Sequence, residues 1–236
     1  MQENIEVKTT ENQKELIIRQ GEASPVREPK PLHIVGDIMT VYEFLSKRTI
    51  DPHNSHIKVV KNSSSAVINL NIDETSQFKG LVQGVLSTSN EFDMWKINSD
   101  QTKGVSELAQ FMKKKKRHFV DQSAGMKVIH ELLNFKPKVE KSLEKMDDQR
   151  GNQRYKKEQA VDHNLPPSFS ITIPLFEGES PVTVNVEFLI DPNTFDCCLI
   201  SDELEEKMEK QVDERINEEL NKIRELMPEL PIIYTV

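Results

Sequence analysis

The chain has 236 residues, of which 36% are hydrophobic and 30% charged, and its net charge is −8 at pH 7. This composition supports a folded core and excludes a wholly disordered chain. Two adjacent cysteines, Cys197 and Cys198, exclude a secreted disulfide framework, and no apolar run reaches the roughly 18 residues that a membrane span needs. Because the polar start of the chain lacks a signal-peptide pattern, we expect a cytoplasmic protein.

The first part of the chain is predicted to be rich in β-structure. Residues 1–13 show no periodicity, which predicts a flexible tail. Within residues 14–100, a helical turn is expected at Val41–Lys47, with Thr40 as its N-cap. Alternating or β-branched runs predict five strands in the same part: Glu15–Arg19, Leu32–Ile38, His56–Val60, Ala66–Ile72 and Gly80–Leu86.

The middle of the chain, residues 101–163, is predicted to be helical and basic. Apolar residues recur at helical spacing after Ser106 and again after Ser123, which is a suitable N-cap. A third helix is expected after Pro137, since proline is tolerated in the first turn. The almost wholly polar residues 147–163 are interpreted as a loop or a protruding helical arm.

The last part, residues 164–236, has the clearest pattern. It predicts a hairpin, a third strand, a long amphipathic helix capped by Ser201, and a final strand. The apolar stripe of the long helix is interpreted as packing on a sheet, with an oligomer contact as the alternative. The strands are expected at Phe169–Leu175, Val182–Ile190, Phe195–Ile200 and Pro231–Val236.

The order of these elements indicates an α+β fold. Strands come first, then helices, then a hairpin with a strand, a helix and a strand, which is not the alternation of a doubly wound parallel sheet. We expect mainly antiparallel sheets, a central helical segment and a long C-terminal amphipathic helix. The four parts of the chain are compatible with one domain overall.

Charge is unevenly distributed along the chain. Residues 101–160 carry 15 Lys or Arg against 8 Asp or Glu, a balance of +7, whereas residues 161–236 carry 5 against 17, a balance of −12. A basic middle and an acidic end can attract one another within one chain, between subunits, or toward outside partners. We therefore expect a protein partner or self-association, with nucleic acid as a further candidate and no membrane.

The sharpest local feature is a run of five cations before His118. Clustered cations release counterions when they bind nucleic acid. The candidate nucleic-acid contacts are Lys113, Lys114, Lys115, Lys116 and Arg117. The alternative is a solvated helix end, where cations favour the negative C-terminus. Phe111, Phe119 and Tyr155 could stack on bases, but the spacing of the two phenylalanines favours the core.

No residue pattern indicates catalysis, a metal or a cofactor. His53 and His56 have a spacing compatible with metal ligands, but no cysteine or carboxylate cluster completes a set nearby. Asp147, Asp148 and the acidic start of the last helix could hold a divalent ion for nuclease chemistry, or they could be solvated faces. Glycine-rich phosphate loops and nucleophile-elbow motifs are absent from the sequence. We expect no catalytic residue and no cofactor; enzymatic activity stays open, and a non-catalytic role is favoured.

Two stretches resemble the YfdQ-like family of phage and prophage proteins. Residues 165–178 (LPPSFSITIPLFEG) run from a proline turn into a strand ending at a phenylalanine and a glycine, and Glu107–Phe111 is similar to the family's central helix. Val35–Arg48 and Gly80–Asn98 are similar more loosely, so that the likeness spans most of residues 32–190. The resemblance implies a phage accessory role in a bacterial host and carries no catalytic residues.

These features together predict a function by binding. We expect a non-catalytic phage or prophage accessory protein that binds a macromolecule, in phage DNA metabolism or in interference with a host factor. A self-assembling structural component and a metal-dependent nuclease are the alternatives.

Overall fold

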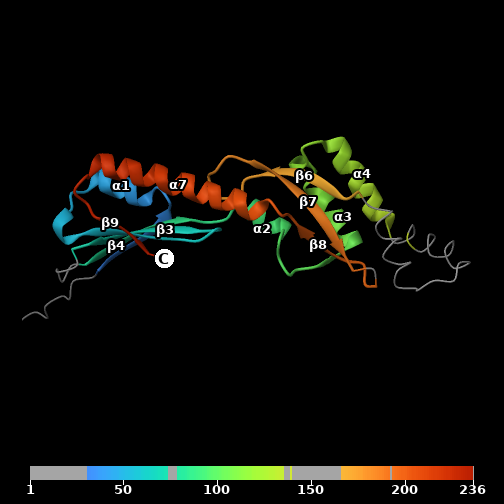
Figure 1. Ribbon diagram of the computed structural model, residues 1–236, viewed down its shortest axis with the longest axis horizontal. Helices are drawn as coiled ribbons and strands as arrows, with labels where there is room; N and C mark the ends of the chain where they lie inside the picture. The colour runs from blue at the N-terminus through green and yellow to red at the C-terminus, as the bar shows by residue number, and fades with distance from the viewer. Residues whose placement is uncertain (1–30, 74–78, 136–138, 140–165, 192, 236) are drawn as a thin grey trace, which may run out of the picture. The chain divides into compact units, whose positions relative to one another are not determined.

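The described residues of the protein form two β-sheets with helices packed against them (Figure 1). The computed structural model describes residues 31–73, 79–135, 139, 166–191 and 193–235, and Pro31–Val236 forms one compact unit. One sheet has the order β1-β4-β3-β2-β9 and the other β5-β8-β7-β6, with mostly antiparallel pairs. The predicted α+β class is therefore confirmed. The predicted tail, the Glu15–Arg19 strand and the arm at residues 147–163 lie outside the described residues.

The five-stranded sheet has an antiparallel centre and parallel edges. Its central strands β2, β3 and β4 form a meander, while β1 runs parallel to β4 and β9 runs parallel to β2. In β3, Ile68 and Leu70 are fully buried on one face, whereas Asn69 and Asn71 are half-buried on the other, as their alternation predicts. The strands are β1 (Leu32–Asp37), β2 (His56–Lys61), β3 (Ala66–Ile72), β4 (Gly80–Leu86) and β9 (Ile232–Thr235), with a 3-10 turn η1 (Pro52–Asn54) before β2.

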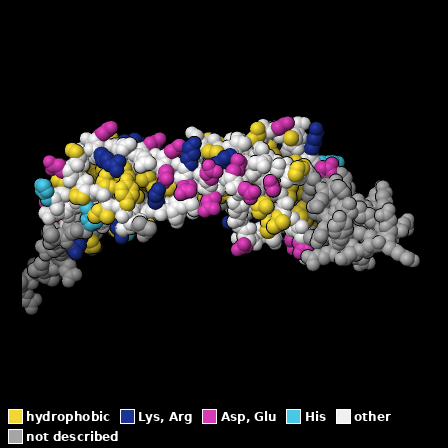
Figure 2. Space-filling view, in the orientation of Figure 1, with side chains coloured by type: hydrophobic (Ala, Val, Ile, Leu, Met, Phe, Trp, Pro, Cys, Tyr) yellow, Lys and Arg dark blue, Asp and Glu magenta, His cyan; other side chains and the backbone are white. Residues whose placement is uncertain are grey.

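Helices α1 (Thr40–Lys47) and α7 (Leu204–Leu226) pack together on one face of this sheet (Figure 1). The apolar stripe of α7 is buried inside the chain, which agrees with sheet packing rather than an open oligomer contact. The outward side of α7 carries interspersed acidic and basic side chains (Figure 2). Although α7 has 23 residues, neither it nor any other described helix is long and apolar enough to cross a membrane. The stripe consists of Leu204, Met208, Val212, Ile216, Leu220 and Ile223.

The four-stranded sheet packs with the shorter helices. Its strands β6 and β7 form the predicted hairpin, and β8 continues it antiparallel to β7. Helices α3 and α4 pack against each other, and the short helix η2 contacts both α4 and β6. The elements are α2 (Asn90–Trp95), β5 (Lys103–Gly104), α3 (Val105–Lys114), η2 (Lys116–His118), α4 (Gln122–Leu133), β6 (Ser168–Ile173), β7 (Val182–Ile190) and β8 (Asp196–Ile200).

The predicted N-caps are wrong by one or two residues, since the N-caps are Met39, Asp121 and Glu203. Thr40 is the first residue of α1 and makes no cap bond, and Ser123 lies inside α4 because the carboxylate of Asp121 accepts its backbone N–H at 2.7 Å. Ser201 lies before α7, because its backbone N–H and C=O both bond the side-chain amide of Asn98, at 2.8 Å each. Ser201 is thus held by Asn98 in the segment that follows α2, and the helix begins at Leu204.

Candidate nucleic-acid interface

The five predicted contact residues occupy the end of α3 and the turn that follows it. Lys113 and Lys114 form the last turn of α3, Lys115 is its C-cap, and Lys116 and Arg117 begin η2. All are exposed except Lys115, which is half-buried. Their positive charge lies where the helix dipole is negative, which stabilises the helix end by a few tenths of a kcal/mol to about 1 kcal/mol. We call residues 113–117 the basic turn.

Among the five residues of the basic turn, Arg117 is the one that forms an ion pair with a described residue. Arg117 pairs through Nη2 with the carboxylate of Glu91 on α2. Among the residues that the structure describes, none of the four lysines forms an ion pair. The four lysine ammonium groups therefore have no described carboxylate to neutralise them.

His118, the next residue along the chain, is buried behind the basic turn. Its side chain is 4% exposed, and its Nδ1 accepts a hydrogen bond of 2.9 Å from the indole Nε1–H of Trp95. Because indole nitrogen can only donate, a neutral His118 must carry its proton on Nε2. Nε2–H is then directed at Glu91, whose Oε1 lies 3.7 Å away. Arg117 Nε also lies 3.3 Å from Nε2, but a neutral imidazole has a single acceptor nitrogen, which Trp95 already occupies.

The surroundings of His118 favour its neutral form. Burial lowers the pKa of His118 below its ordinary value of 6.5, Glu91 opposes this by raising it, and the cations of Arg117 and Lys115 lower it further. The ring is thus uncharged at pH 7 and can act as the acceptor that Trp95 requires.

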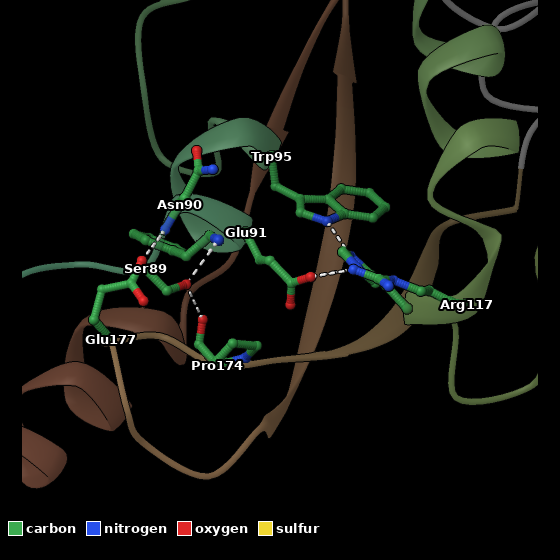
Figure 3. Close-up of polar contacts among 9 residues, drawn as sticks. Ser89, Asn90, Glu91, Trp95, Arg117, Pro174 and Glu177 are labelled. Atoms are coloured by element: carbon green, nitrogen blue, oxygen red, sulfur yellow. Dashed lines mark hydrogen bonds and ion pairs between the residues drawn. The ribbon is translucent and has the colours of Figure 1, made fainter.

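Helix α2, which carries both Glu91 and Trp95, is anchored at its start (Figure 3). The hydroxyl of Ser89 accepts the backbone N–H of Phe92 at 3.0 Å and donates to the carbonyl of Pro174 after β6. The carboxylate of Glu177 accepts the backbone N–H of Asn90 at 2.9 Å. Glu91 and Trp95 therefore approach the basic turn from a helix fixed to the β6–β7 hairpin.

Aromatic rings surround Trp95 and leave little aromatic surface for bases. Phe119 is 5% exposed and contacts Trp95 edge-on, with ring centroids 6.1 Å apart. Phe111 is half-buried, also meets Trp95 edge-on at 5.1 Å, and lies under the ammonium of Lys103 at 5.4 Å. The core placement predicted for Phe119 is confirmed, Phe111 is partly exposed, and Tyr155 lies outside the described residues.

The other sequence candidates do not form a reactive site in the described part of the chain. Cys197 and Cys198 are free thiols on β8, and burial raises the pKa of Cys197 to about 12, so that it stays protonated. No group of three or more His, Cys, Asp or Glu side chains that could hold a metal ion occurs among the described residues, which include His53 and His56. Asp147 and Asp148 lie outside the described residues.

A cleft of about 390 Å³ lies at the carboxyl ends of the parallel strands β1 and β4. Its one basic lining residue, Arg215 of α7, is already surrounded by carboxylates: Glu179 at 3.0 Å, and Glu218 and Glu219 at 3.1 Å each. Because that guanidinium is neutralised within the protein, the described lining of the cleft offers no free cation to an anionic ligand.

The network behind the basic turn is the feature that sequence reasoning missed. Trp95 and His118 are 23 residues apart, and no motif joins them. No local signal could have found the pair, because Trp95 ends the acidic helix α2 and His118 follows the basic turn. The fold and this geometry define an α+β protein with an exposed cationic turn supported by a buried Trp–His pair. The chain matches no protein-family model, no curated protein and no solved structure.

Proposed function

We propose that the protein is a non-catalytic accessory protein that binds nucleic acid through the basic turn, Lys113–Arg117. The observation that carries this proposal is the exposure of Lys113, Lys114 and Lys116, which, like the half-buried Lys115, have no ion-pair partner among the described residues. We further propose a place in phage DNA metabolism, which is what the resemblance of residues 165–178 and Glu107–Phe111 to the YfdQ-like family implies.

The physical basis is counterion release from the phosphate backbone. Each lysine that neutralises a phosphate releases condensed cations, so that binding weakens as salt rises, with a slope in log K against log salt of about −0.9 per contact on duplex DNA. The net charge of −8 repels nucleic acid from the rest of the protein. A local cationic turn on an acidic chain should therefore bind in one orientation and with marked salt dependence.

The basic turn is suited to contact phosphates rather than to recognise particular bases. Lysine is a flexible point charge without the bidentate geometry that recognises a base edge. The half-buried Phe111, already in contact with Trp95 and Lys103, adds little stacking surface. We therefore expect weak dependence on base sequence.

The test is a salt-dependent titration of labelled single- and double-stranded DNA of about 20–30 nucleotides, a length that spans many phosphates. The variant changes Lys113, Lys114, Lys115 and Lys116 to Gln. The matched control changes four lysines that are exposed elsewhere to Gln, and so alters the net charge equally: Lys47, Lys58, Lys79 and Lys210.

We expect the basic-turn variant to lose most of its affinity for DNA. The slope of log K against log salt should become shallower by about 0.9 for each phosphate contact removed. The control should lose far less, because its lysines are dispersed. Absence of binding by the wild-type protein at low salt, or equal losses in both variants, would refute the proposal.

A further inference from the structure

The basic turn is anchored to the protein interior at His118. Four of its residues are exposed, whereas the next side chain, His118, is 4% exposed and ends η2. The backbone N–H of His118 donates to the carbonyl of Lys115 at 2.9 Å, which closes the turn on itself. The imidazole is thus the point at which the exposed cations are joined to the core.

The bond that holds this anchor depends on the protonation of the ring. Trp95 Nε1–H donates to Nδ1 at 2.9 Å, and a protonated imidazole would place a second N–H against it. The charged groups that act on the ring are Glu91 from α2 and Lys115 and Arg117 from the turn itself. β6 and α4 also pack against η2, and none of their described charged groups is among those that shift the His118 pKa.

We infer that His118 is a proton-sensitive positioning residue for the basic turn: as a neutral acceptor for Trp95 it holds the lysines in their binding orientation, and its protonation releases them. This inference rests on the proposed nucleic-acid function. A turn that is already ordered loses less conformational entropy when it binds, which strengthens binding without any new contact.

The direction of the expected pH effect separates this role from simple electrostatics. An added positive charge beside a DNA-binding turn should strengthen binding as the pH falls. Release of the anchor should weaken it instead, although the same proton is taken up. The two accounts therefore predict opposite signs.

The experiment combines DNA binding with the fluorescence of Trp95, the chain's one tryptophan. Oligothymidylate carrying a pH-insensitive dye is titrated at constant ionic strength between about pH 8 and pH 5, a range in which its thymine bases and phosphodiesters do not titrate. Indole emission of the free protein is followed over the same range, because a protonated imidazole in contact with indole quenches it. We expect the affinity to fall about fivefold with the same midpoint as the fluorescence, below 6.5.

Two variants of similar size separate positioning from packing. His118→Asn places an uncharged oxygen near the position of Nδ1, so it should bind within about twofold of wild type at pH 8 and show no pH step. His118→Leu has no acceptor and should bind about fivefold more weakly at pH 8. His130→Gln, at an exposed histidine of α4, is the control and should keep the wild-type step.

The outcomes distinguish this inference from the proposed function. Wild-type protein that binds no DNA at any pH refutes both. Wild-type protein that binds, with an affinity that stays constant or rises through the fluorescence midpoint, overturns the role of His118 and leaves the proposed function standing. The pH dependence of wild-type DNA affinity therefore tests the role of His118 even where a variant fails to fold.

Discussion

The indole N–H of Trp95 donates a 2.9 Å hydrogen bond to Nδ1 of His118, and this bond joins α2 to the end of the basic turn. Because Nδ1 accepts this buried hydrogen bond, the bond requires an uncharged imidazole. The imidazole directly follows the most basic segment of the chain.

The stability of the protein should fall on acidification in part through His118. The folded-state pKa of His118 lies below its ordinary value of 6.5, so the unfolded chain binds the proton more readily. The contribution is fully present above pH 6.5 and is lost as the pH falls through the lower, folded-state pKa. Urea unfolding of wild type and His118→Asn at pH 7.5 and pH 5 should show the larger drop in wild type. An equal drop in both would contradict it.

Arg117 should contribute less to DNA binding than its neighbour Lys116. Its guanidinium is paired with Glu91, whereas Lys116 has no ion-pair partner among the described residues. Lys116→Gln should reduce the salt slope by about 0.9, and Arg117→Gln, an equal change in charge, by less than half as much. Titrations of both variants over one salt series give the comparison. A larger loss for Arg117→Gln would mean that the Glu91 pair opens on binding.

Gly125 of α4 should be intolerant of a side chain. A Cβ at this position would lie 2.4 Å from the ring of Phe119, which packs against Trp95 behind the basic turn. Overpacking of this kind costs about 1–3 kcal/mol, which exceeds the gain of about 1 kcal/mol in helix propensity. Gly125→Ala should therefore lower the urea midpoint. The control is Gly104→Ala, where a Cβ would meet nothing within 4 Å.

Glu219 of α7 should be far more important to stability than the adjacent Glu218. Glu219 is fully buried, 3.1 Å from Arg215 and 2.7 Å from Lys222, whereas Glu218 is 61% exposed. Removing one partner of a buried pair leaves uncompensated charge and costs about 3–5 kcal/mol, while an exposed pair contributes about 0–1 kcal/mol. Glu219→Gln should thus destabilise strongly and Glu218→Gln only slightly, as measured by urea unfolding. Similar effects would show that water reaches the buried pair.

The carboxylates beside the cleft at Arg215 pair with residues of the protein itself. Glu179, Glu218 and Glu219 all pair with the same guanidinium, and Glu219 also pairs with Lys222. These pairs lie within the acidic last part of the chain, and they engage the cleft's arginine with the protein's own carboxylates. At the basic turn, by contrast, Glu91 pairs with Arg117, and no described carboxylate pairs with the four lysines.

Much of the fold was predictable from local periodicity. The alternation in β3 and in the β6–β7 hairpin assigned those strands and their buried faces, and the spacing of apolar residues assigned α7 and its buried stripe. The basic turn was visible as five consecutive cations at a helix end. These features depend on residues that are neighbours in sequence or repeat at a fixed interval.

The parallel edges of the five-stranded sheet, the true helix starts and the Trp95–His118 bond were decided by tertiary structure. β1 pairs with β4, and Ser201 with Asn98, across many residues that carry no common pattern. The sequence by itself determined which segments are strands or helices and where the cations gather, since those follow from short-range periodicity. Only the folded chain brings the indole of Trp95 to the imidazole of His118, because that contact depends on how distant elements pack.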